Sequence, residues 1–220
     1  WSMPFTVRNT PGDSQSINLA GSLTGIGVQS SSNLTFNDLT LDNRAVGIDA
    51  YPSNTSSTSL TFNRVNASGN GTGIGIRAGG ASHTLNTVTA NDRDTGVVLY
   101  GPSALSITTL VAKRNRTQGL SLESLSAGTA PVLSGLDLRD NGIGFNINNW
   151  SLAMVVRNTP GDSQSLDVSG SDTGIYVGNS ANITFRDLTL ANPTAAITAW
   201  HSSRATSNSN MRFENLTLSG

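Results

Sequence analysis

The chain has 220 residues, a net charge of −1 at pH 7 and no cysteine, and only 12% of its residues are charged. This composition excludes disulfides and cysteine-based metal sites, and it does not favour binding to nucleic acid or to an anionic membrane, which need clustered Lys and Arg. No apolar run reaches the roughly 18 residues of a membrane span.

Short blocks of alternating apolar residues recur along the whole chain. Each block reads apolar-x-apolar-x-x-apolar-x-apolar, which predicts two short strands joined at a corner, because alternation with period two is the strand signal. The blocks are Leu34–Leu41, Leu60–Ala67, His83–Ala90, Leu105–Ala112, Pro131–Leu138, Ile183–Leu190 and Met211–Leu218.

A glycine six residues after most of these blocks opens a third apolar-x-apolar strand. This glycine is Gly25, Gly47, Gly73, Gly96, Gly144 or Gly174, and it suits a tight corner. The repeat is therefore three short strands in 22 to 29 residues. Two inward columns are predicted, one of Ile26, Ile48, Ile74, Val97, Leu120, Phe145, Ile175 and Ile197, and one of Leu39, Val65, Val88, Leu110, Leu136, Leu188 and Leu216.

This repeat resembles that of the right-handed parallel β-helix proteins, the pectate-lyase-like solenoids. The resemblance implies an all-β, right-handed parallel β-helix of about nine coils over residues 1–220. Enzymes of this group usually act on acidic polysaccharides, with converging carboxylates or with Ca²⁺ and a basic residue.

The chain also contains a longer repeat, which spans several coils. The stretch VRNTPGDSQS occurs at Val7–Ser16 and at Val156–Ser165, and 27 of 43 residues are identical between Trp1–Asn43 and Trp150–Asn192. We therefore expect residues 1–149 to be one six-coil cassette and residues 150–220 to be the first half of a second cassette. Pro11-Gly12 within the repeated stretch favours a type II turn over a carboxylate site at Asp13 and Asp162.

Few residues suggest chemistry. Asp92, Asp94, Arg114, Arg116 and Asp140 follow second strands and are expected to gather on one polar edge, which is either a solvated turn or a site for a cation or sugar. His83 replaces a leucine of its column and indicates a structural residue, and Tyr51, Tyr100 and Trp200 either stack on sugars or cover loops. No catalytic residue, cofactor or metal ligand is predicted.

Asparagines in N-x-[ST] sequences are candidate glycan acceptors. Those predicted are Asn33, Asn54, Asn66, Asn70, Asn115 and Asn182, of which Asn54, Asn70 and Asn115 are expected to lie in turns.

The sequence predicts a non-catalytic structural or adhesive module of a long, repetitive extracellular or cell-surface fibre. Its expected partners are further copies of the repeat stacked end to end, and surface polysaccharide. The alternative is a β-helix that cleaves or binds polysaccharide. Ice binding is a third reading of the outward column Thr6, Thr35, Thr61, Thr84 and Ser106, which Val132, Val155 and Arg212 interrupt.

Overall fold

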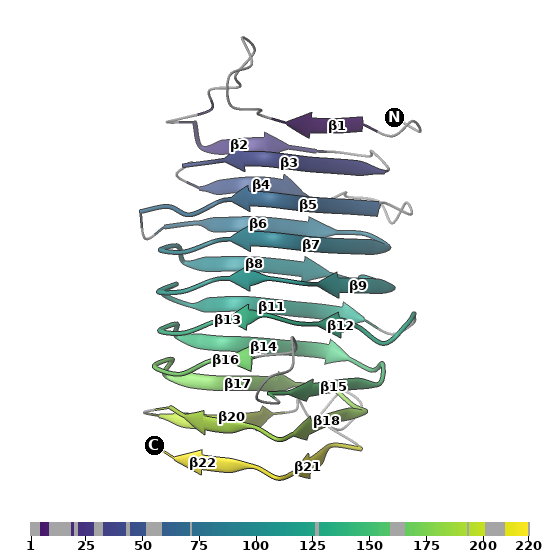
Figure 1. The fold of residues 1–220 in the computed structure, drawn as a ribbon, viewed down its shortest axis with the longest axis vertical. Coiled ribbons are helices and arrows are strands. Elements are labelled where there is room, and N and C mark those ends of the chain that lie inside the picture. The colour runs from purple at the N-terminus through teal and green to yellow at the C-terminus, as the bar shows by residue number, and fades with distance from the viewer. Residues whose placement is uncertain are drawn as a thin grey trace.

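The computed structural model describes residues 5–8, 19, 22–28, 33–42, 45–51, 59–70, 72–125, 128–158, 166–192, 194–200 and 210–219. These residues form one stack of parallel strands, with the first described strand at one end and the last at the other (Figure 1). No helix long and apolar enough to cross a bilayer occurs among them. Residues 9–16 and 159–165, which carry Asp13 and Asp162 of the repeated stretch, lie outside the described residues, as does Asn54.

Two large sheets make up most of the stack. The first sheet contains β1 (Phe5–Arg8), β3 (Leu34–Thr40), β5 (Ser59–Asn66), β7 (Ser82–Thr89), β9 (Ala104–Ile107), β10 (Leu110–Val111), β12 (Val132–Leu133), β13 (Leu136–Asp137) and β16 (Leu166–Asp167). The second contains β2 (Thr24–Gly27), β4 (Val46–Ala50), β6 (Ile74–Gly79), β8 (Thr95–Tyr100), β11 (Gln118–Leu125), β14 (Ile143–Trp150), β17 (Thr173–Gly178) and β20 (Ala195–Trp200).

Two smaller sheets continue the first sheet beyond β12 and β16. One consists of β15 (Met154–Arg157), β18 (Ile183–Arg186) and β21 (Arg212–Glu214), and the other of β19 (Thr189–Ala191) and β22 (Thr217–Ser219). All pairings are parallel between successive coils, as the predicted all-β parallel β-helix requires. The described residues make about seven complete turns, slightly fewer than the nine coils predicted. The difference arises because the first coil shows no described second strand and the last shows no third strand.

The predicted corner between the first two strands is a single residue with a left-handed backbone. Asp38, Arg64 and Thr87 occupy this position in three successive coils, with φ of 56°, 51° and 60°. There the backbone turns without ending the hydrogen-bonded pairing, so β3, β5 and β7 are each one continuous strand where two were predicted. In a later coil the same position holds Gly135, with φ of 58°.

The inward columns form the core, with one correction. Five members of the first column are fully buried, namely Ile48, Val97, Leu120, Phe145 and Ile175. Six members of the second column are at most 3% exposed, namely Leu39, Val65, Val88, Leu110, Leu136 and Leu188. Ile76, however, stands between Ile48 and Val97, whereas Ile74 pairs with Val46 and Thr95 and is only half-buried. The prediction of Ile74 as a core residue is therefore wrong. The turn before β6 is two residues longer than its neighbours, and Gly75, not Gly73, continues the glycine column.

The outer surface of the first sheet carries two ranks of small polar residues. Thr6, Thr35, Thr61, Thr84 and Ser106 are in register, followed by Val132, as the sequence predicts. Beside this rank, Asn63 donates an amide hydrogen bond of 2.7 Å to Asn37, and Asn86 donates one of 2.9 Å to Asn63. The asparagine amides thus bond to one another along the stack and hold successive coils together.

Candidate functional site

The predicted polar edge lies where second strands turn into third strands, in three successive coils. Arg114 donates two hydrogen bonds to Asp92 in the coil before it, through Nε and Nη2, each of 2.8 Å. Nη2 of Arg116 lies 2.8 Å from Oδ1 of Asp94, and the other oxygen of Asp94 accepts the backbone N–H of Gly73 at 3.0 Å. Each of these acids therefore has an arginine partner one coil away.

The ion pairs of this edge shift the pKa of Arg114 and occupy the carboxylates of Asp92 and Asp94. The carboxylate of Asp92 raises the pKa of Arg114 through its hydrogen bonds first and its charge second. Asp140 contributes less to this shift and lies under Gly170, at the rim of a shallow hollow of about 430 Å³. The carboxylates of Asp92 and Asp94 are paired with arginines. Among the described residues, no three or more His, Asp or Glu side chains are grouped to hold a metal.

The same pairing between coils occurs at other positions. Arg64 donates to both oxygens of Asp38, at 2.5 and 2.9 Å, and Arg77 likewise pairs with Asp49. The hydrogen bond from Arg64 is the main reason why the pKa of Asp38 is lowered. Acid–arginine pairing one coil apart is thus a recurring feature of the surface.

A buried polar column runs behind the polar edge, and sequence reasoning missed it. The backbone N–H of Arg93 donates to Oδ1 of Asn115, and that of Asn115 donates to Oδ1 of Asn141, at 2.9 and 2.8 Å. The side chain of Arg93 is fully buried and donates to the carbonyl oxygens of Ala67 and Ser68, at 3.1 and 2.8 Å. Burial lowers the pKa of Arg93, and the charge of Asp42 opposes this.

The sequons differ in accessibility. Asn33, Asn66, Asn70 and Asn182 are exposed. Asn115 is 1% exposed, and its side-chain oxygen accepts a backbone hydrogen bond. Because a glycan must be attached to the amide nitrogen in solvent, the folded chain does not present Asn115 as an acceptor.

Two of the predicted aromatic residues meet on the outer surface of the second sheet. The rings of Tyr51 and Tyr100 come from alternate coils, and their centroids lie 4.8 Å apart in an edge-to-face arrangement. Gly79 pairs with Tyr100 from the intervening coil, and its lack of a side chain leaves room for this contact. The guanidinium carbon of Arg77 lies 5.9 Å from the centre of the Tyr51 ring.

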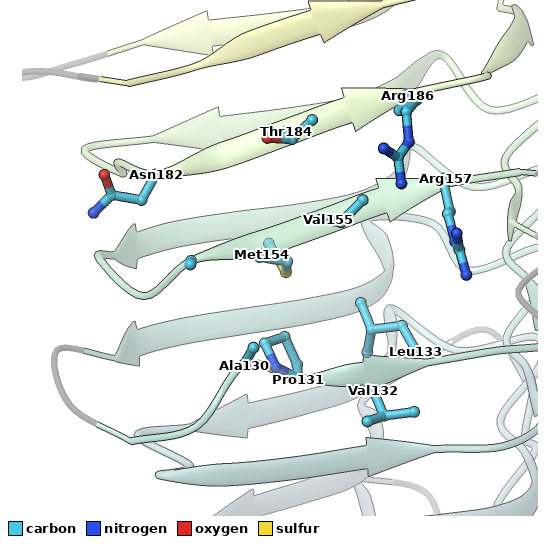
Figure 2. Close-up of a pocket in the computed structure, with 11 residues that line it drawn as sticks. Ala130, Pro131, Val132, Leu133, Met154, Val155, Arg157, Asn182, Thr184 and Arg186 are labelled. Carbon is cyan, nitrogen blue, oxygen red and sulfur yellow. The ribbon is translucent and has the colours of Figure 1, made fainter.

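A hollow of about 340 Å³ opens where the first sheet ends, between β12 and β15. Figure 2 shows β15 standing visibly farther from β12 than from β18, with Arg157 and Arg186 one above the other at one end of the hollow. Val132 and Val155 line it and are 55% and 46% exposed. Within the described residues β12 pairs with β9, but with no strand on its other side.

Proline explains why pairing stops here. The N–H of Ser134 donates to Ile107 in the coil before, so by strand alternation the backbone groups of Leu133 and Pro131 face β15. Proline has no N–H to donate at this position. In β15 the N–H of Met154 donates to Asn182 in the coil after, so the backbone of Val155 faces β12. Two strand edges therefore face each other without pairing.

Comparison with known proteins identifies the family. The sequence profile described as "Right handed beta helix region" matches residues 24–218. The chain belongs to the right-handed β-helix family. No curated protein and no solved structure matches it significantly.

Two features of this β-helix had signals in the sequence that the repeat analysis did not use. The buried polar column is visible as Arg93, Asn115, Asn141 and Ser171, each three residues after the last apolar residue of its block. The break in the first sheet is marked by Pro131, which opens a block where most other blocks begin with Leu, Ile or Met. Both signals concern backbone hydrogen bonds, which an apolar pattern does not register.

Proposed function

We propose that this β-helix is a structural module of a repetitive extracellular fibre, and that it is not an enzyme. The observation that supports this best is the pairing of acids with arginines between coils, at Asp92–Arg114 and Asp94–Arg116. Paired carboxylates join neighbouring coils and do not converge on a substrate-sized cleft. Such pairs hold successive coils together along the axis of the stack, and they create no reactive group.

The arrangement of the coils fits a fibre. Each coil is capped only by the next, and apolar side chains such as Phe5 and Phe213 are more than half exposed at the two ends of the described stack. Exposed strand edges favour pairing with a further strand. We infer that further repeats, in the same chain or in a stacked neighbour, cover these ends.

The experiment is a length series with one, two and three 149-residue cassettes. Six coils at about 4.8 Å each should add roughly 29 Å to the particle for each cassette. Small-angle scattering and electron microscopy measure this increment, and thermal unfolding should shift upward with length because each cassette buries the end of the last. A constant particle length, or independent beads joined by linkers, would contradict the proposal.

Carbohydrate binding is the second candidate function, and the pair Tyr51–Tyr100 is the observation that favours it. Tyr51 is 47% exposed, and Arg77 and Asp49 provide hydrogen-bonding groups next to it. An aromatic face flanked by polar groups can stack on a sugar ring. Binding to an array of neutral and acidic glycans that is lost on Tyr51→Ala, with the fold intact, would favour this function.

A further inference from the structure

We draw no further inference here: the strongest candidate, the shallow hollow that Asp140 and Asp172 flank in the turns after β13 and β16, belongs to the polar edge already described, and nothing among the described residues shows what would fill it.

Discussion

Gly96 lies directly beside Gly119 of the next coil, and a Cβ on Gly96 would stand 2.6 Å from the carbonyl oxygen of Gly119. The same close approach recurs along the glycine column, at 2.5 Å for Gly47 and 2.7 Å for Gly75. The side chain there is excluded by the backbone of the neighbouring coil. The glycines of the repeat are therefore fixed by packing between coils, in addition to any preference of the corner.

The first prediction is that Gly96→Ala destabilises the chain. Because backbone atoms of the next coil must shift, we expect a loss of about 1–3 kcal/mol in the free energy of unfolding, measured by urea denaturation. Gly27→Ala is the control, since a Cβ there would meet nothing within 4 Å. Equal stability of Gly96→Ala and wild type would show that the coils separate more easily than this packing indicates.

The second prediction contrasts two isoleucines in one strand. Ile76 is fully buried in the inward column, whereas Ile74 is half-buried beside the turn. Ile76→Ala should cost about 2–5 kcal/mol of unfolding free energy, the usual range for a buried isoleucine. Ile74→Ala should cost clearly less, because fewer contacts are lost. A larger loss for Ile74→Ala would reverse the assigned register of β6.

The comparison of Ile74 with Ile76 shows how far the sequence determines the fold. Alternating apolar residues identify the coils and nearly all core positions, since each coil must bury the same face. The register of one strand also depends on how many residues the preceding turn loops out. Ala67 to Gly75 spans two more residues than Ala90 to Gly96, and both glycines at 73 and 75 fit the pattern. Pairing with β4 and β8 decides between them.

For the candidate sites too, the sequence predicts which residues lie near one another but not how they pair. The polar edge could be predicted, because Asp92, Asp94, Arg114 and Arg116 occupy equivalent turns, but its pairing could not, since an arginine reaches an acid only once the coils are stacked. The hollow between β12 and β15 is a gap between strands that a regular repeat predicts to be adjacent. Its only marker in the sequence is Pro131.

The third prediction concerns the polar edge. Asp92→Asn should cost less than 1 kcal/mol, because the Asp92–Arg114 pair is about half exposed and surface ion pairs contribute little. Asp94→Ala should cost more, about 1–2 kcal/mol, since it also removes the acceptor for the N–H of Gly73. Neither the wild type nor the variants should cleave polygalacturonate or alginate, assayed by absorbance and reducing ends. Cleavage that disappears in Asp92→Asn would identify an enzyme.

The fourth prediction concerns glycans on material secreted from a glycosylating host. Asn33, Asn66, Asn70 and Asn182 are exposed and should be accessible to modification, whereas the buried Asn115 should remain bare in folded chains. Glycopeptide mass spectrometry measures the occupancy at each site. Substantial occupancy at Asn115 would mean that modification precedes folding of that coil.

The last prediction concerns His83, which is in register with Leu60 and Leu105 of the two neighbouring coils and is fully buried. Neither ring nitrogen makes a hydrogen bond of good geometry within the described part of the chain. Burial lowers the pKa of His83 from 6.5 to about 4, and backbone groups of Ser82 and Tyr100 oppose the shift only partly.

Because the pKa of His83 is lowered in the folded chain, the unfolded chain takes up a proton at His83 at a higher pH than the folded chain does. The free energy of unfolding should therefore not vary with pH through His83 above pH 6.5, and it should fall as the pH drops from 6.5 toward 4.

His83→Leu restores the residue type of the neighbouring coils and removes an unsatisfied polar group, so it should stabilise the chain by about 1–3 kcal/mol at pH 7. The difference in unfolding free energy between His83→Leu and wild type should grow by about 2 kcal/mol from pH 7 to pH 5, because protonation of His83 in the unfolded state destabilises the wild type alone. Urea unfolding of both proteins at the two pH values measures this difference, and Leu105→Ala serves as a core substitution whose effect should not change with pH. A gap between wild type and His83→Leu that stays constant with pH would mean that His83 gains a partner when protonated in the folded chain.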